Sequence, residues 1–240
     1  MPRSAIRTFP SDDGSTDTSW PNLCDNRRMS GPVQPYPLHG SIEPEDAKEI
    51  LRKAIRTARS ARTERRRDEA ALAIADVIET IPDVLSARCV ATYAARPTEP
   101  GTTAMLERLS ARGVRVLLPV LGAGLQRDWA EFDGAHDLQV RAPGRPPEPS
   151  GPTLGAAALA DADVVIAPAL AVDSNGVRLG QGGGWYDRAL EHVRPGTKVI
   201  AVVFPEEVYD ATDRPLPLEK HDRTVDAVAT PLGWRWIGQD

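Results

Sequence analysis

The stretch RLGQGGGWYDR, residues 178–188, contains four glycines within five residues, followed by two aromatic residues, an aspartate and an arginine. Glycine permits positive φ angles and lets other groups approach the backbone closely. Successive amide N–H groups in such a turn can form an anion-binding nest, which a following helix N-terminus would reinforce. The loop therefore predicts a phosphate site, although its spacing matches neither the dinucleotide fingerprint nor the Walker A motif.

The residues that end this stretch add charge of both signs to the predicted site. A carboxylate beside bound phosphate is repelled unless a cation lies between them, so Asp187 is interpreted as a magnesium ligand. Arg178 or Arg188 could neutralise the remaining phosphate charge through charge-assisted hydrogen bonds. The alternative role for Asp187 is that of a helix N-cap.

Two other groups of polar residues could serve the same site. Lys48 and Arg52 are four residues apart, so on a helix they would share one face and could reach a triphosphate together. Near the C-terminus, LPLEKHD places His221 and Asp222 before the last apolar run, where a surface turn is the alternative. The many basic residues of segment 48–67 are interpreted as a solvated helix face.

Hydrophobic periodicity predicts the elements that position these residues. Apolar residues at helical spacing indicate a helix that starts near residue 41 and a second one over residues 64–81, which Pro82 ends. Short apolar runs, typical of strands buried on both faces, lie at residues 89–94, 114–120, 163–170 and 198–204. Further helices are expected at residues 102–112, closed by Gly113, and at 153–162 and 187–193.

This alternation predicts an α/β fold, with a mostly parallel sheet flanked by helices in a single domain over residues 42–240. In such sheets ligands bind beyond the carboxyl ends of the strands, which is where the glycine loop would follow strand 163–170. Residues 144–152 are expected to form a long irregular loop. Residues 1–41 are rich in Ser, Asp, Pro and Gly without periodicity, and are expected to be a disordered extension.

Composition limits the function classes. The net charge is -5, with 29 basic and 34 acidic residues, so no overall field favours nucleic acid or an anionic membrane. No apolar run approaches the roughly 20 residues that span a bilayer, and no signal peptide is evident, so a cytoplasmic protein is expected. Cys24 and Cys89 match no metal or redox spacing and are interpreted as inert thiols. The lack of sustained heptads favours a monomer.

The order of several motifs resembles that of the 5-formyltetrahydrofolate cyclo-ligase family, also called methenyltetrahydrofolate synthetase. The motifs are Lys-x-x-Leu-Arg on the early helix, TEPGT after a strand, PALAVDSNGVRLGQGGGWYDR, LPLEKHD and DAVATP. The similarity runs from about residue 46 to residue 232. It implies an enzyme that uses ATP and magnesium to convert 5-formyltetrahydrofolate to 5,10-methenyltetrahydrofolate, with release of ADP and phosphate.

The resemblance also implies roles for individual residues. For ATP these are Lys48, Arg52, Arg178, Leu179, Gly180, Gln181, Gly182, Gly183, Gly184, Trp185, Tyr186, Asp187 and Arg188. The magnesium ligands would be Asp187 and Asp222, and the folate contacts Ala94, Glu99 and Tyr186. Arg178, Arg188 and Tyr186 would act at the reacting groups.

The chain departs from the usual family pattern at several positions. Gln181 stands where arginine is common, Trp185 where tyrosine is common, and Val172 where phenylalanine is usual. The loss of a charge at Gln181 is expected to weaken triphosphate binding. The sequence EPGT changes the backbone after Glu99, and so affects the folate contact more than the nucleotide contact.

Two other functions fit parts of this pattern. One is a sugar-phosphate isomerase or CoA transferase, whose α/β domains also bind phosphate with glycine loops and need no ATP. The other is a non-catalytic relative that binds folate or nucleotide, which the departures at Gln181 and EPGT would allow. Turnover of 5-formyltetrahydrofolate coupled to ADP release distinguishes the cyclo-ligase from both.

Overall fold

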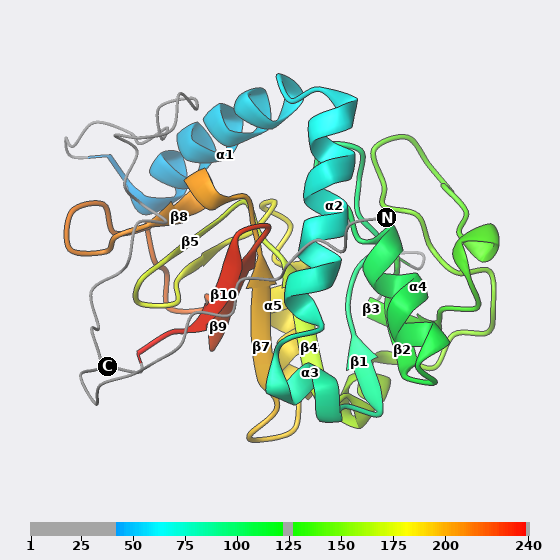
Figure 1. Cartoon of the computed structure of the whole chain (residues 1–240). Helices are drawn as coiled ribbons and strands as arrows, with labels where there is room; N and C mark the ends of the chain where they lie inside the picture. Colours follow the sequence, from blue (N-terminus) through cyan, green and yellow to red (C-terminus); the bar gives the residue numbers. More distant parts are fainter. Residues whose placement is uncertain (1–41, 122–126, 239–240) are drawn as a thin grey trace, which may run out of the picture.

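A seven-stranded mixed sheet forms the centre of the protein (Figure 1). The computed structural model describes residues 42–121 and 127–238, so the expected disordered extension and Cys24 lie outside the described residues. The spatial order of the strands is β10 (Gly233–Trp236), β9 (Ala227–Thr230), β7 (Lys198–Val202), β4 (Val164–Pro168), β1 (Cys89–Ala91), β2 (Arg115–Leu121) and β3 (Arg127–Glu131). The five inner strands are parallel and both edge strands are antiparallel, which confirms the predicted mostly parallel sheet.

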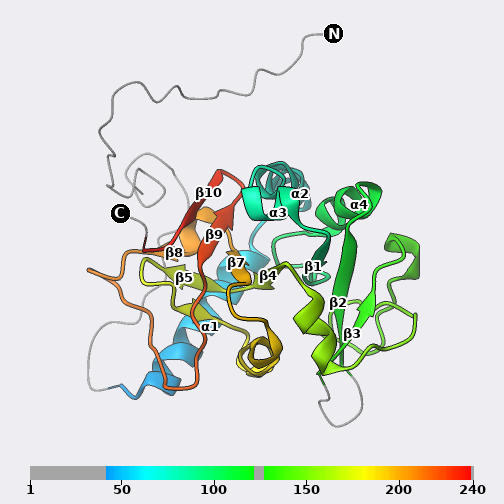
Figure 2. The same ribbon diagram turned by 90° about the horizontal axis from the view of Figure 1, so that it is seen from below.

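Helices cover both faces of this sheet, as the alternation of elements predicts. The α-helices are α1 (Pro44–Ser60), α2 (Glu64–Ile78), α3 (Pro82–Ser86), α4 (Thr103–Ala111) and α5 (Trp185–Ala189). Short 3-10 helices are η2 (Ala135–Asp137), η3 (Ala156–Asp161), η4 (Leu190–His192) and η5 (Pro205–Glu207). Figure 2 shows α2, α3 and α4 on one side of the strands, and α5 and η3 on the other.

Several element boundaries differ from the sequence-based prediction. The second helix ends at Ile78 rather than at residue 81, and Pro82 begins the short helix α3, since proline is well tolerated in a first turn. The segment expected to be a helix at 153–162 is the 3-10 helix η3. The helix expected at 187–193 starts earlier, at Trp185, and changes to a 3-10 helix after Ala189. Gly113, with a φ of 77°, does close α4.

A second, three-stranded sheet was not predicted. It consists of β5 (Ala171–Asp173), β6 (Arg178–Leu179) and β8 (Val208–Tyr209), which are too short to show a clear period in the sequence. Leu51 and Ile55 on the inner face of α1 pack on this sheet in a separate apolar cluster with Leu179 and Tyr209. This packing places α1 beside the strand that leads into the glycine loop.

A buried ion pair fixes the C-terminal end of α1. Arg59 and Glu207 are both almost fully buried, and the Arg59 guanidinium donates to both Glu207 oxygens at 2.7 Å. The guanidinium also donates to the Ala169 carbonyl at 2.7 Å, just after β4. Arg59 therefore ties α1 to the carboxyl end of the central sheet.

We expect Glu207→Gln to lower the free energy of unfolding by about 3 kcal/mol, because removing one partner leaves the other charge buried without compensation. Urea denaturation at neutral pH measures this loss. The neighbouring Glu206 offers a matched control, because it pairs with the more exposed Arg62, and Glu206→Gln should cost about 1 kcal/mol or less. Equal losses in the two variants would contradict the role given to the Arg59–Glu207 pair.

Two predictions from composition concern Cys89 and the membrane. Cys89 is buried in β1, and burial raises the pKa of its thiol to about 11, as expected for an inert thiol. None of the helices in the described residues has the length and apolar character that crossing a bilayer requires.

Candidate active site

The site lies at the carboxyl ends of the central strands. From β1 the chain continues to β2 on one side, whereas β4, β7 and β9 follow on the other, so the connections diverge between β1 and β4. Such a switch point is where open α/β sheets bind ligands. A cleft of about 710 Å³ opens there, and its walls include Ala94 after β1, Leu121 at the end of β2 and Pro168 at the end of β4.

The structure brings together every residue that the sequence predicts for the site. All of them line this one cleft, although they come from four separate segments of the chain: α1 with Lys48 and Arg52, the segment after β1 with Ala94 and Glu99, residues 178–188, and the segment with Asp222. Their proximity is a property of the fold. Their individual roles stay predictions.

The glycine loop runs from the end of β6 to the start of α5 and is surrounded by guanidinium groups. Gly182 and Gly184 have positive φ values of 104° and 57°, which residues other than glycine rarely adopt. A methyl group would lie 3.0 Å from the Arg178 guanidinium at Gly180, 3.4 Å from that of Arg52 at Gly182, and 3.3 Å from that of Arg188 at Gly184. The absent side chains therefore leave the loop backbone open to three positive charges.

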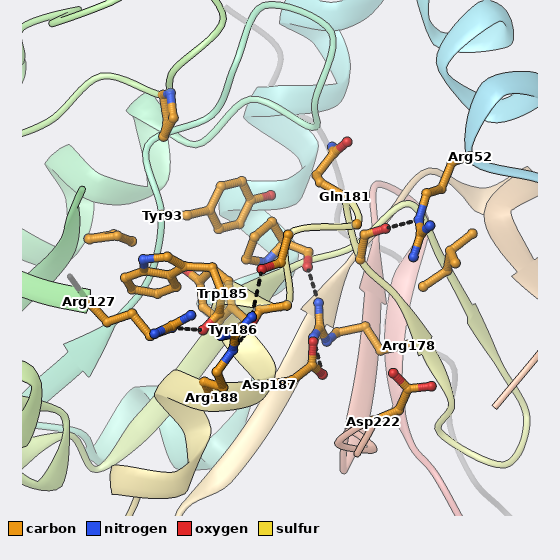
Figure 3. Close-up of a pocket in the computed structure, with 18 of the residues that line it drawn as sticks. Arg52, Tyr93, Arg127, Arg178, Gln181, Trp185, Tyr186, Asp187, Arg188 and Asp222 are labelled. Carbon is orange, nitrogen blue, oxygen red and sulfur yellow. Dashed lines mark hydrogen bonds and ion pairs between the residues drawn. The ribbon is translucent and has the colours of Figure 1, made fainter. Parts of the chain in front are cut away.

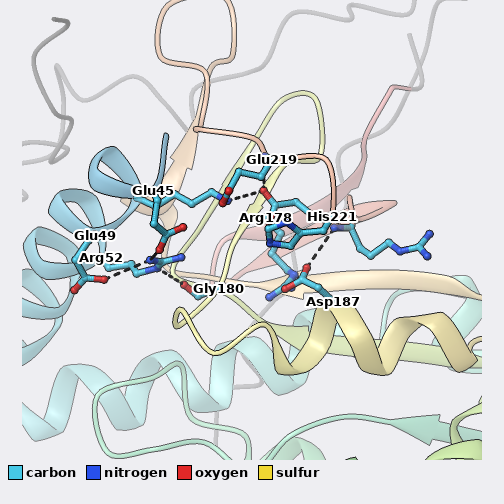
Figure 4. Close-up of polar contacts among 11 residues, drawn as sticks. Glu45, Glu49, Arg52, Arg178, Gly180, Asp187, Glu219 and His221 are labelled. Atoms are coloured by element: carbon cyan, nitrogen blue, oxygen red, sulfur yellow. Dashed lines mark hydrogen bonds and ion pairs between the residues drawn. The ribbon is translucent and has the colours of Figure 1, made fainter. Parts of the chain in front are cut away.

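These guanidinium groups contribute more to an anion site than the helix that follows. The helix α5 has only five residues, so its dipole is small. It therefore reinforces the anion site less than the sequence predicts. Arg52 donates to the Gly180 carbonyl at 3.2 Å and pairs with Glu45 and Glu49 (Figure 4). Arg52 is held against the loop in this way, and its charge is already present where a phosphate would bind.

Arg178 has the most buried side chain of the three arginines, with 3% of it exposed against 8% for Arg52. Its guanidinium donates to Asp187 Oδ1 at 2.8 Å and to the Pro168 carbonyl at 3.3 Å, while the buried Nε has no partner among the described residues. Figure 4 shows Arg178 and Asp187 side by side. Arg188, in contrast, is exposed, and within the described part of the chain its side chain donates to carbonyls of the loop, those of Gly183 and Gly184.

Lys48 joins α1 to the segment that carries Asp222. Its ammonium lies 2.5 Å from Glu219 and 2.7 Å from Asp222, and only 4% of the residue is exposed. Burial alone would lower the pKa of Lys48, but the hydrogen bonds to Asp222 and Glu219 outweigh it and raise the pKa. Burial alone would raise the pKa of Asp222, but the hydrogen bond from Lys48 holds it below the ordinary value. Both groups therefore stay charged at neutral pH.

The donor set of the cleft suits a hard divalent cation, because Mg²⁺ prefers carboxylate oxygens. The carboxylates of Asp187 and Asp222 both line the cleft near the glycine loop. Within the described residues, the group with ligand atoms within 4.8 Å of one another consists of Glu219, His221 and Asp222, and does not include Asp187. Magnesium coordination by Asp187 and Asp222 stays a prediction.

The opposite end of the cleft is aromatic (Figure 3). Trp185 packs edge-on against Tyr186 and Trp129, with ring centroids 5.0 and 5.3 Å apart. The hydroxyl of Tyr186 donates to the Thr92 carbonyl, and burial raises its pKa well above the ordinary value. The hydroxyl thus stays neutral and already has a partner, so a wall of the cleft is the role of Tyr186 that fits best.

The Gln181 side chain points away from Arg178 and Asp187 (Figure 3). Its amide donates to Glu99 Oε1 at 2.8 Å, and the other Glu99 oxygen accepts the backbone N–H of Arg96 at 2.9 Å. Glutamine in place of the arginine that is common at position 181 therefore affects Glu99, to which it donates a hydrogen bond. This effect comes in addition to any effect that the missing positive charge has on phosphate binding.

Sequence reasoning missed several residues that line the cleft: Glu45, Tyr93, Arg96, Arg127 and Glu219. A signal existed for two of them, because Tyr93 is the next-to-last residue of the apolar run 89–94 and Glu219 belongs to the same motif as Asp222. Arg127 lies on β3, a strand that was not predicted.

The fold and the cleft together define a single-domain α/β protein whose cleft, at the switch point of the sheet, has a positively charged end and an aromatic end. Comparison with known proteins makes this more specific. The sequence profile of the 5-formyltetrahydrofolate cyclo-ligase family matches residues 44–231. The chain belongs to this family, which confirms the sequence-based resemblance and sets aside the isomerase and CoA-transferase alternative.

Individual relatives agree with this assignment. The chain is 40% identical over 152 residues to the 5-formyltetrahydrofolate cyclo-ligase of Mycolicibacterium smegmatis, covering 61% of this chain and 75% of that protein. It is 31% identical over 187 residues to that of Escherichia coli K12, covering 76% and 100%.

Solved structures are similar over most of the described fold. The 5,10-methenyltetrahydrofolate synthetase of Aquifex aeolicus has a TM-score of 0.66 and 25% identity, covering 80% of this chain and 94% of that one. The Mycoplasma pneumoniae synthetase has a TM-score of 0.59 and 17% identity, covering 77% and 98%, which supports the fold alone.

Proposed function

We propose that this chain converts 5-formyltetrahydrofolate and ATP to 5,10-methenyltetrahydrofolate, ADP and phosphate. The observation that carries the proposal is that one cleft, in a member of the cyclo-ligase family, has a glycine loop surrounded by arginines at one end and aromatic side chains at the other. This arrangement matches a reaction that must hold a triphosphate against a pterin.

The charged end of the cleft suits the ATP phosphates. Arg52, Arg178 and Arg188 surround the loop, and Lys48 adds a fourth positive charge beside Asp222. Guanidinium groups form paired hydrogen bonds with phosphate oxygens, and the loop amides can share the remaining charge. ATP is thus proposed to lie with its terminal phosphate between the loop and α1.

The aromatic end suits the folate. Trp185 and Tyr93 offer apolar surfaces to a pterin, and Glu99 offers carboxylate oxygens to its polar edge. Arg96 and Arg127 also line the cleft, and the guanidinium group of neither pairs with a carboxylate among the described residues. Folates carry glutamate carboxylates, so these two cations complement the tail of the substrate.

The formyl oxygen is a poor leaving group until it is phosphorylated. In the proposed reaction it attacks the γ-phosphate of ATP, which releases ADP and leaves a phosphorylated formyl carbon. The N10 amine then attacks that carbon and loses its proton to the phosphate, and the carbon–oxygen bond breaks so that the oxygen leaves with the phosphate. The chain contributes alignment and charge, and neither step requires a protein nucleophile.

Magnesium, when bound, would neutralise part of the triphosphate charge. Asp187 and Asp222 are the residues proposed to hold it. Arg178 orients Asp187 toward the cleft through its 2.8 Å contact, and Lys48 orients Asp222 at 2.7 Å. Consumption of ATP and reduced folate fits the cytoplasmic, monomeric enzyme that the sequence predicts.

The proposal is tested with purified protein, (6S)-5-formyltetrahydrofolate, ATP and magnesium, following methenyl absorbance and ADP together. We expect equal amounts of both products and none when ATP is omitted. Tight folate binding without turnover would instead identify a non-catalytic relative. ADP release without methenyl product would show that the folate is not the phosphate acceptor.

A further inference from the structure

Arg56 connects α1 to the folate end of the cleft, although it does not line the cleft itself. Lys48, Arg52 and Arg56 follow one another at four-residue intervals on α1, so they share one face. Lys48 contacts Asp222 and Arg52 contacts the Gly180 carbonyl, both at the charged end. Arg56 instead contacts Gln181, whose side chain continues toward Glu99.

The contacts form a continuous chain of hydrogen bonds. Arg56 donates to the Gln181 carbonyl at 2.8 Å and to the side-chain Oε1 of the same residue at 3.3 Å. The Gln181 Nε2 then donates to Glu99 Oε1 at 2.8 Å. The only other polar contact of the Arg56 side chain among the described residues is with Glu49, at 3.5 Å.

Each link in this chain restricts the next. A guanidinium is a donor only, so Arg56 requires the Gln181 oxygen to face it. The Gln181 amide nitrogen then faces Glu99, whose two carboxylate oxygens both accept hydrogen bonds. The second Glu99 oxygen accepts from the Arg96 backbone at 2.9 Å, so the carboxylate of this buried residue, which is 7% exposed, is held at both oxygens.

We propose that Arg56 is a positioning residue for the folate site, which acts through Gln181 to fix the carboxylate of Glu99. The proposal rests on the proposed function, in which Glu99 contacts the folate. Arg56 does not contact the substrates. Its loss should leave the glycine loop in place, because Arg52 still holds the Gly180 carbonyl.

Substitution of Arg56 should therefore affect the two substrates unequally. We expect Arg56→Ala to raise the KM for 5-formyltetrahydrofolate about fivefold to tenfold, as for the loss of one typical hydrogen bond. The KM for ATP should change less than about twofold. Arg56→Lys retains a donor and a charge, and its KM for folate should be close to that of the protein without substitutions.

The matched control is Lys53→Ala, which removes one positive charge from an exposed position on the same helix. It should change neither KM. The double variant Arg56→Ala with Gln181→Ala distinguishes action through Gln181 from an independent effect, since residues that act in series are not additive. The double variant should raise the folate KM no more than Gln181→Ala alone.

Calorimetric titration of folate into each protein, without ATP, separates this inference from the proposed function. If the protein without substitutions neither binds folate nor forms methenyl product, the proposed function is wrong, and this inference fails with it. An active unchanged protein, with Arg56→Ala indistinguishable from Lys53→Ala, would overturn the inference alone. So would equal increases in both KM values, or effects of Arg56→Ala and Gln181→Ala that multiply.

Discussion

Asp187→Asn is expected to lower the turnover of 5-formyltetrahydrofolate about 1000-fold, a loss of about 4 kcal/mol of transition-state stabilisation. Both contacts of the Asp187 carboxylate, from the Arg178 guanidinium and from the Arg223 backbone, use Oδ1. Asparagine keeps an oxygen at that position, so the loop geometry should survive. The variant loses the negative charge and the second oxygen, which is the one free for a cation among the described residues.

The magnesium dependence of the rate identifies the cause of the loss. The half-saturating magnesium concentration should rise for Asp187→Asn, and melting temperature without ligands should change little. Asp68→Asn is the control, because it removes the same charge from an exposed position on α2 outside the cleft. A large loss of rate with an unchanged magnesium requirement would exclude Asp187 from the metal site.

The sequence predicts four of the five parallel strands because they are continuous apolar runs, and it identifies β9 as an apolar run without assigning it to a strand. It does not predict β3 or β10, since these edge strands, RDWAE and GWRW, mix charged and aromatic residues. Nor does it predict the small sheet, whose strands of two or three residues are formed by tertiary contacts alone. A central strand that is buried on both faces is recognised in the sequence by its continuous apolar run, and an edge strand does not need such a run.

The residues of the site likewise divide into those that the sequence predicts and those that it does not. The glycine loop, Lys48 and Asp222 are found from motifs, because their local spacing identifies them. Partners that come from distant segments are not predictable from spacing. Glu219 lies 171 residues from Lys48, and Arg56 lies 125 residues from Gln181. These contacts exist only because α1 packs on the small sheet, next to the loop.

The variant Lys48→Met tests the contribution of one such contact to catalysis. We expect it to lower kcat/KM for ATP about 500-fold, equivalent to about 3.7 kcal/mol, while the KM for folate changes less than about threefold. Methionine fills the buried volume without charge. It therefore leaves Glu219 and Asp222 uncompensated, and their repulsion would act on the triphosphate that Lys48 is proposed to bind.

The pH dependence of the rate separates this effect from simple misfolding. Lys48 holds the pKa of Asp222 below its ordinary value against the opposite effect of burial, so removing Lys48 should raise that pKa. The ionised form would then be lost at a higher pH, and the acid limb of the rate profile should move upward. Lys53→Met, on the exposed face of α1, should leave the profile and the KM for ATP unchanged. Equal losses of ATP and folate affinity in Lys48→Met, with no movement of the acid limb, would show that Lys48 supports the structure of the cleft rather than binding the nucleotide.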